Sequence, residues 1–219
     1  MKKKISVNFA TKLSPMSEKL DHVVYSKEVV EFVTVAKEFC IFVESFSEIS
    51  VQDFFEKLRK FLPLIYLKGS LLPKVESDGY SEVERFISED DWNYLRENLK
   101  EKFAQYDEYV GVFEDRTYDE DEADVHSLSE DITDIYNALK DFIICYRNGL
   151  VDVVNEALWD LKEAFDEYWG KSSVNALQII HNLLLNEIVV DDLHAKNHNR
   201  DMKDSFISRR QAELRGEND

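Results

Sequence analysis

The chain has 219 residues, a net charge of −18 at pH 7 and a pI near 4.7. This charge excludes a broad nucleic-acid-binding surface, because phosphate binding needs clustered Lys and Arg side chains, and it suits a basic protein partner better. Apolar residues make up 44% of the chain, and it has only six glycines and three prolines, which excludes general disorder and favours long helices.

The cysteines and the N-terminus predict a cytoplasmic protein. Cys40 and Cys145 each lie in an apolar helical run, as free core thiols do in a reducing compartment. Lys2 to Lys4 are followed by residues too polar for a signal peptide, and no apolar run is long enough for a membrane span. Met16, directly after Pro15, is an alternative start.

We expect three parts in chain order. Residues 1–24 are predicted to be a flexible tail, residues 25–195 a single helical domain, and residues 196–219 a polar tail. The first helix is expected from Ser26 to Ser47, and its two adjacent apolar seams predict that it is largely buried. A second helix is expected to begin at Ser50, where Asp53 completes a capping-box pattern.

Pro63 is expected to kink or divide that second helix. A third helix, from Glu89 to about Ala104, begins after Ser88 and carries a charged outer face. The periodicity then breaks down, and residues 106–124 form a mixed aromatic and acidic segment.

Residues 129–170 contain the strongest pattern, two amphipathic runs separated by a very short turn. Gly149 marks the turn, and Gly170 is predicted to end the second helix. The apolar positions of the two runs, spaced by three and four residues, are Ile132, Ile135, Tyr136, Leu139, Phe142, Ile143 and Tyr146, then Val151, Val154, Leu158, Leu161, Phe165 and Tyr168. Two such helices fold back on each other as an antiparallel hairpin.

A last core helix is expected to begin at Ser172 or Ser173, with His181 on its apolar seam. The predicted fold class is therefore all-α: a bundle of about five or six antiparallel helices with a central helical hairpin and an irregular acidic loop.

Two segments resemble a known family. Tyr106 to Asp115 (YDEYVGVFED) and Ser127 to Phe142 (SLSEDITDIYNALKDF) are similar to an uncharacterised all-helical domain-of-unknown-function family of Bacteroidetes-type bacteria. The resemblance covers roughly residues 16–193. It implies a helical fold and supplies no activity, cofactor or catalytic residue.

The spacing of acidic residues partly matches three kinds of metal site. Asp119, Asp121 and Glu130 match positions 1, 3 and 12 of a calcium loop, but Asp124 replaces the glycine of the sharp turn. The pairs Glu28/Glu31 and Glu163/Asp166 have the one-turn spacing of helical metal-dependent hydrolases, and Asp191, His194 and His198 have metal-ligand spacing near the polar C-terminus. None of these patterns is complete, so no catalytic, cofactor or metal residue is predicted.

The segment of residues 106–124 is the predicted partner-binding surface, because aromatic side chains anchor interfaces and carboxylates attract basic partners. Its candidate residues are Tyr106, Tyr109, Phe113, Glu114, Asp115 and Tyr118. The alternative is a packing loop that covers helix ends. The predicted function is a non-enzymatic cytoplasmic interaction or adaptor domain, and the alternative is a metal-dependent hydrolase. Convergence of at least four carboxylates within a few ångströms in a cleft would favour the hydrolase.

Overall fold

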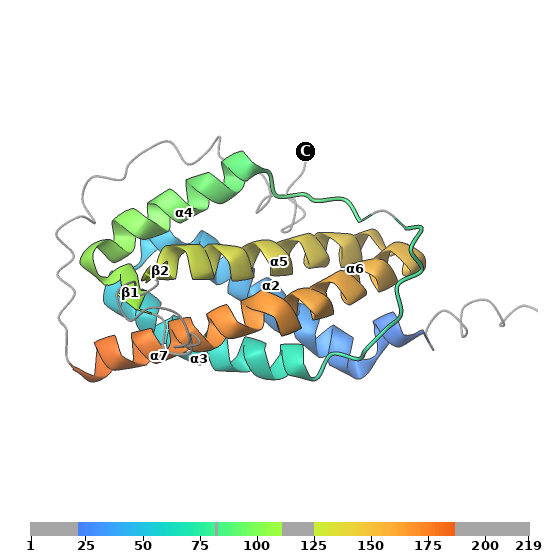
Figure 1. The fold of residues 1–219 in the computed structure, drawn as a ribbon, viewed down its shortest axis with the longest axis horizontal. Helices are drawn as coiled ribbons and strands as arrows, with labels where there is room; N and C mark the ends of the chain where they lie inside the picture. The colour runs from blue at the N-terminus through green and yellow to red at the C-terminus, as the bar shows by residue number, and fades with distance from the viewer. Residues whose placement is uncertain (1–21, 82, 111–124, 187–219) are drawn as a thin grey trace, which may run out of the picture.

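The computed structural model describes residues 22–81, 83–110 and 125–186. They form a helical bundle (Figure 1), which confirms the all-α prediction. The α-helices are α2 (Lys27–Glu44), α3 (Val51–Ser70), α4 (Glu89–Phe103), α5 (Leu128–Asn148), α6 (Val151–Ala164) and α7 (Gly170–Leu185). Shorter helical turns are η1 (Val23–Tyr25), η2 (Phe46–Glu48), η3 (Ala104–Tyr106) and the π-helical η4 (Phe165–Trp169). None of the helices in these ranges is long and apolar enough to cross a membrane.

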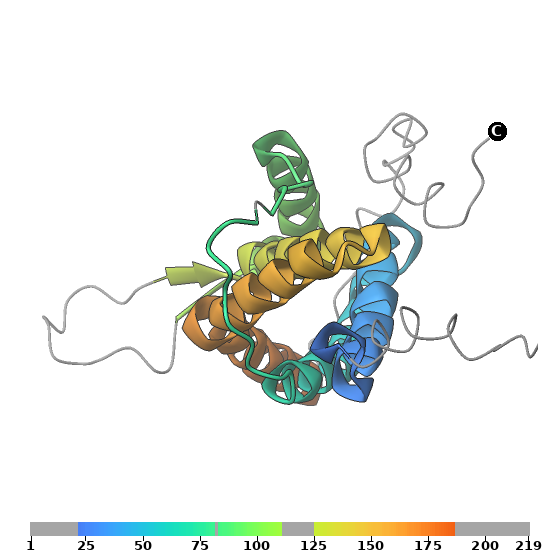
Figure 2. The same cartoon turned by 90° about the vertical axis from the view of Figure 1, so that its right-hand side faces the viewer.

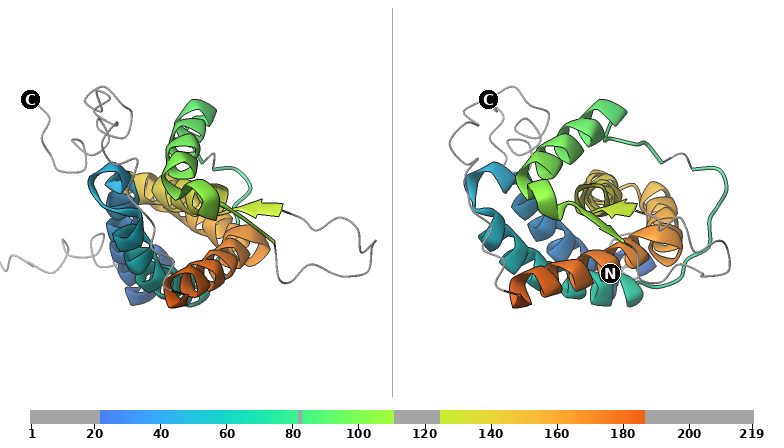
Figure 3. Two further views of the ribbon diagram at one scale, coloured as in Figure 1. Left: turned by 90° about the vertical axis from the view of Figure 1, so that its left-hand side faces the viewer. Right: turned by 60° about the vertical axis from the view of Figure 1, so that its left-hand side comes forward.

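Helix α5 is the element on which most others pack. It contacts α2, α4, α6 and α7, while α3 packs on α2 and α7 and closes the opposite side of the bundle. Viewed end-on, α2 and α3 form one side, the α6–α7 rod forms another, and α5 lies across the top (Figure 2). Helix α4 lies outside this arrangement, against α5 (Figure 3).

The central hairpin is the part of the fold that the sequence predicts best. Helix α5 ends at Gly149, whose φ of 70° places it in the left-handed region that favours glycine, and α6 begins two residues later. The α5 seam is buried as expected from Ile132 through Leu139 to Ile143. Leu158 and Leu161 of α6 are buried as well.

The predicted stop at Gly170 was wrong, because the chain continues helically from α6 through η4 into α7 (Figure 1). A π-helical turn holds about one residue more than an α turn, so it shifts the apolar face by one position. Trp169 is consequently buried, whereas the predicted seam residue Tyr168 is 56% exposed. A Cβ atom at Gly170 would lie 2.5 Å from the carbonyl oxygen of Phe165, so the glycine serves the π turn and does not end the helix.

The same shift changes the buried face of α7. His181 is exposed, contrary to the prediction, and the buried line runs through Ser173, Ala176 and Ile180. Ser173 is not an N-cap, because its hydroxyl donates to the carbonyl oxygen of Trp169 within the helix. Small residues allow α7 and η4 to approach α3 closely, since a Cβ atom at Gly69 would lie 2.6 Å from the Trp169 ring.

Helix α3 is continuous across Pro63, so the predicted division does not occur. Leu58, Leu62 and Ile65 are fully buried on both sides of the proline, and this packing holds the helix together where local propensity opposes it. At the predicted capping box, the Ser50 side chain accepts from the backbone N–H of Asp53. A capping box is present at the start of α4, where Ser88 and Asp91 satisfy each other's backbone N–H groups.

The remaining predictions concern the ends and the irregular segment. The packed structure begins before the predicted boundary at residue 25, because Val24 in η1 is fully buried. Part of the irregular segment forms a small antiparallel sheet of β1 (Glu108–Val110) and β2 (Val125–Ser127), in which Tyr109 pairs with His126.

Candidate functional site

The predicted partner-binding residues do not form one exposed surface in the described structure. Tyr109 is only 8% exposed, and its hydroxyl donates a hydrogen bond to Asp131 of α5 while its ring stacks on His126. Tyr106 is half-buried in η3. The other candidates, Phe113, Glu114, Asp115 and Tyr118, lie outside the described residues. Tyr109 therefore anchors the small sheet to the bundle, which agrees with the packing alternative for this residue.

Asp131, which accepts the hydrogen bond from Tyr109, is buried. Burial raises the pKa of its carboxyl to about 6, against the opposing effects of hydrogen bonds from Tyr109 and Ser172 and of the nearby His126. The carboxyl side chain thus joins β1, β2, α5 and α7, and its charge changes in a mildly acidic solution.

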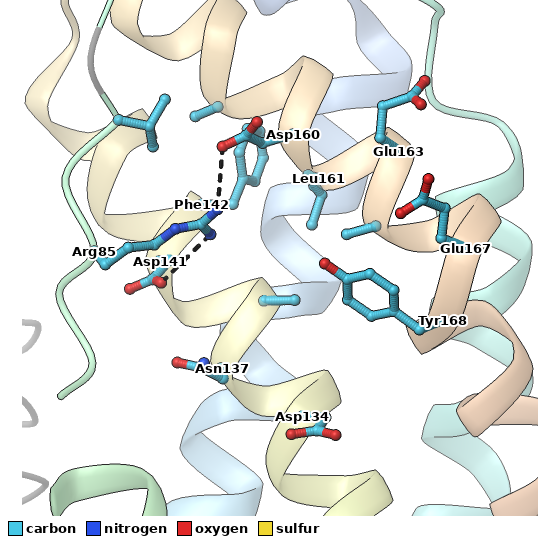
Figure 4. Close-up of a pocket in the computed structure, with 14 residues that line it drawn as sticks. Arg85, Asp134, Asn137, Asp141, Phe142, Asp160, Leu161, Glu163, Glu167 and Tyr168 are labelled. Atoms are coloured by element: carbon cyan, nitrogen blue, oxygen red, sulfur yellow. Dashed lines mark hydrogen bonds and ion pairs between the residues drawn. The ribbon is translucent and has the colours of Figure 1, made fainter. Parts of the chain in front are cut away.

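The chain has a cleft of about 370 Å³ between α5 and the continuous helical segment of α6 and η4, which we call the α6–η4 rod. The segment that connects α3 to α4 lies next to this cleft. Five carboxylate side chains line it: Asp134, Asp141, Asp160, Glu163 and Glu167. Its apolar lining consists of Val83, Ala138, Phe142, Ala157, Leu161 and Ala164. Arg85 supplies the cation of the lining (Figure 4). The cleft therefore combines an apolar wall with a strongly negative rim.

The carboxylates come from two matching stripes. Asp134, Asn137 and Asp141 follow one another at three- and four-residue steps on α5. Asp160, Glu163 and Glu167 do the same along α6 and η4. Residues at these steps share a helix face, so the antiparallel hairpin brings the two polar stripes opposite each other.

Residues 71–81 and 83–88, which we call the strap, lie at one end of the cleft. Asp141 is nearly fully buried and accepts backbone hydrogen bonds from Phe86 (2.9 Å) and Ile87 (3.2 Å). Arg85 of the strap donates to Asp160 of α6 at 3.2 Å and lies 3.9 Å from the free oxygen of Asp141. This end of the cleft is therefore already occupied by a guanidinium group.

The opposite end is open. Glu163, Glu167 and Tyr168 lie on the side of the cleft away from Arg85 (Figure 4). Within the described ranges, neither of the two glutamate carboxylates has a hydrogen bond or ion pair. Asp134 accepts a hydrogen bond from the Trp92 indole at 2.8 Å, and the side-chain oxygen of Asn137 is buried without a described partner. The free acceptors at this end exceed the donors that the described chain supplies.

Partial burial changes the titration of the cleft. It raises the pKa values of Asp134, Asp141 and Asp160 above the ordinary aspartate value, although Arg85 opposes this for Asp141 and Asp160. A cation that entered the cleft would favour the charged forms and lower these pKa values again.

The carboxylates line the cleft without converging on one point. Among the described residues, no group of three or more His, Cys, Asp or Glu side chains could hold a metal ion. One member of each one-turn pair from the sequence has a lysine partner: Lys68 contacts Glu31 at 2.6 Å, and Lys162 contacts Asp166 at 2.9 Å. The geometry that would favour a metal-dependent hydrolase is thus not found in the described part of the chain.

The described residues of the calcium-loop pattern make other contacts. Ser127 caps α5 through the backbone N–H of Glu130, and the Glu130 carboxylate pairs with Arg96 at 2.9 Å. Asp119, Asp121 and Asp124 of this pattern, together with Asp191, His194 and His198, lie outside the described residues.

A second polar cluster lies on another face of α5 and is closed to solvent. Glu44 of α2 and Lys140 of α5, each 1% exposed, form an ion pair at 2.6 Å, and the Tyr136 hydroxyl donates to the same Glu44 oxygen at 2.8 Å. The second Glu44 oxygen is buried without a described partner. Burial, followed by the charge of Glu44, raises the pKa of Tyr136 well above its usual value.

Sequence reasoning missed both the cleft and this cluster. It considered Glu163 only as half of a metal pair. The two matching polar stripes on the hairpin were a signal that could have located the cleft. By contrast, no local pattern connects Arg85 with Asp160, or Glu44 with Lys140.

Comparison with known proteins places the chain in a family. Residues 23–186 match a family described as a domain of unknown function (DUF5063), and the chain belongs to it. The chain is similar to protein BF1032 from Bacteroides fragilis, for which a crystal structure exists. The two chains are 36% identical in sequence, and their structures superpose with a TM-score of 0.67. The match covers 74% of this chain and 95% of that one. No curated protein matches the chain.

Proposed function

We propose that this protein is a non-enzymatic, cytoplasmic protein-interaction domain that binds a basic partner in the cleft between α5 and the α6–η4 rod. The observation that carries the proposal is the lining of the cleft, in which five carboxylates face one arginine. A cationic side chain with an aliphatic stem fits a site that has acidic groups at its rim and apolar groups along its wall.

The open end supplies the contacts that such a side chain needs. Glu163 and Glu167 offer carboxylate oxygens without described partners. Tyr168 is 56% exposed beside them, and an aromatic ring attracts a cation through the negative face of its π-system. The π turn supports this proposal, because it presents Glu167 and Tyr168 at the cleft, and π turns are frequent at functional sites.

The charge of the whole chain supports the same class of partner. A net charge of −18 accelerates the approach of a basic protein, and the acceleration weakens as salt screens it over about 8 Å at physiological ionic strength. The acidic and aromatic residues 106–124 stay a predicted second contact, to be tested by Glu114→Lys with Asp115→Lys.

The test uses a fluorescent peptide with four arginines that alternate with alanines. Neutralising the open end by Asp134→Asn, Glu163→Gln and Glu167→Gln should weaken binding about tenfold. Exposed ion pairs contribute a fraction of a kcal/mol each, so the loss of three should cost about 1.4 kcal/mol of binding free energy, which corresponds to a tenfold change in affinity. The matched control, Glu28→Gln with Glu38→Gln and Glu48→Gln, removes the same charge from exposed positions on α2 and η2.

Fluorescence anisotropy at two salt concentrations gives both affinities. A loss confined to the cleft variant supports the proposal. Equal losses in the two variants would mean that the peptide responds only to net charge, and the cleft would then not be the binding site.

A further inference from the structure

The Arg85 side chain forms ion pairs in the cleft, yet most of its surface is exposed to solvent. Its guanidinium bridges Asp160 at 3.2 Å and Asp141 at 3.9 Å, and its side chain is 65% exposed. An ion pair this exposed contributes little to stability, because water screens it and ordering the long side chain costs entropy. Holding the fold together is therefore a poor account of why a guanidinium lies there.

The strap does not need this guanidinium to stay in place. Glu156 of α6 accepts hydrogen bonds from the Ser77 hydroxyl (2.6 Å) and from the backbone N–H of Asp78 (3.0 Å). Asn155 donates to the carbonyl oxygen of Glu76 at 2.9 Å. Together with the backbone hydrogen bonds to Asp141, these contacts anchor the strap on both sides of Arg85. The Arg85 side chain is thus free to swing out while the backbone remains bound.

We infer that Arg85 is an internal competitor, a resident guanidinium that occupies one of two cation subsites in the cleft and is displaced by an arginine of the partner. The inference rests on the proposed function. The first subsite is formed by Asp141 and Asp160, and the second, open subsite by Glu163, Glu167 and Tyr168. A guanidinium suits the first subsite because its planar fork presents several N–H groups, and Arg85 donates to Asp160 while it forms a longer ion pair with Asp141.

The spacing of the subsites specifies the partner further. Asp160 precedes Glu163 by three residues and Glu167 by seven, so the subsites lie about 5–10 Å apart along the helix axis. Alternate side chains of an extended peptide lie on one side and about 7 Å apart. The partner segment is therefore an extended chain with two arginines separated by one residue.

Two synthetic peptides test this arrangement: one with the sequence Gly-Ala-Arg-Ala-Arg-Ala-Gly, and one in which the second arginine is alanine. Arg85→Met removes the competing guanidinium and keeps an unbranched apolar stem. The matched control is Arg59→Met, because Arg59 lies on α3, outside the cleft lining, and forms a 2.8 Å ion pair with Glu56. Both variants change the net charge by the same amount.

Calorimetry should show that Arg85→Met binds the two-arginine peptide about threefold or more tightly than Arg59→Met does. The one-arginine peptide should gain no more than about twofold, because the vacated first subsite only adds a second place at which its single arginine can bind. Equal affinities of the two variants for the two-arginine peptide, or weaker binding by Arg85→Met in a protein with an unchanged melting curve, would overturn the inference.

The outcome separates the two proposals. If the triple variant of the open end weakens binding but Arg85→Met has no effect, the cleft binds a basic segment and Arg85 does not compete. If neither change affects binding, both the cleft proposal and the competitor inference fail.

Discussion

Helix α5 carries polar side chains on two faces, which differ in how deeply these side chains are buried and in whether their charges are paired. On the face toward α2, Lys140 and Tyr136 are buried and contact Glu44. The ion pair between Lys140 and Glu44 is almost completely removed from solvent. Toward α6, Asp134 and Asp141 line an open cleft in which negative groups outnumber their cations. One face pairs its charges and excludes water, whereas the other leaves charges unpaired where water reaches them.

The difference shows which charges serve the fold and which remain available for a ligand. A buried charge costs several kcal/mol unless a partner and hydrogen bonds satisfy it, so Glu44 and Lys140 must be matched within the chain. Exposed carboxylates are solvated and incur little of this cost, so Glu163 and Glu167 can stay unmatched until a cation arrives. The following predictions test this contrast.

The largest effect is expected at the buried pair. Lys140→Met should destabilise the protein by about 3–5 kcal/mol, because it leaves the Glu44 carboxylate buried without a counter-charge. Combining it with Glu44→Met should recover most of that loss, since an apolar pair has no charge to desolvate. Urea unfolding of the two variants measures both values. A loss below about 1 kcal/mol in the single variant would place the pair in contact with water.

An intermediate effect is expected at Asp131, which is buried but titrates. Because folding raises its pKa to about 6, the folded state binds the proton more tightly than the unfolded state. The stability that Asp131 contributes is therefore present at low pH and is lost as the pH rises through about 6. Relative to Asp131→Asn, the wild type should gain about 2 kcal/mol between pH 7.5 and pH 4.5.

Chemical unfolding at several pH values measures this difference for Asp131→Asn. Glu38→Gln, at an exposed carboxylate on α2, provides the control. A difference between wild type and Asp131→Asn that does not change with pH would mean that the Asp131 carboxyl is hydrated and not buried between the small sheet and α7.

The smallest effect on stability is expected in the cleft. Combined neutralisation of Asp134, Glu163 and Glu167 should change the free energy of unfolding by less than about 0.5 kcal/mol, the usual range for exposed positions. Thermal unfolding of the triple variant tests this directly. A loss comparable to that of Lys140→Met would show that these carboxylates support the fold, and the contrast between the two faces would disappear.

Several elements were predictable because their causes are local. Ser50 and Ser88 are the N-caps of α3 and α4, where those helices were expected to begin, and Gly149 ends α5 in a left-handed conformation. Pro63 shows the limit of local reasoning, because packing on both sides keeps α3 continuous despite the missing N–H group. Gly170 shows another, since a glycine that looks like a helix stop allows the close approach of a π turn.

The candidate site shows the same division between local and long-range causes. The sequence indicated an acidic protein with a basic partner, and it placed the contact in residues 106–124. Tyr109 turned inward because its hydroxyl has a buried acceptor in Asp131, 22 residues later in the chain. The cleft depends on Arg85 and Asp160, which are 75 residues apart, so no window of neighbouring residues contains both.

The sequence by itself determined the helices up to the start of the π turn, the N-caps at Ser50 and Ser88, the hairpin and the family, because periodicity and capping act over three to seven residues and are visible in any such window. Only the tertiary structure decided which polar groups are buried in pairs and which remain open. Glu44 meets Lys140 across 96 residues, and the π turn rotates Trp169 inward and leaves Tyr168 beside the cleft. These outcomes depend on how helices pack against each other, and burial then sets the cost of every charge.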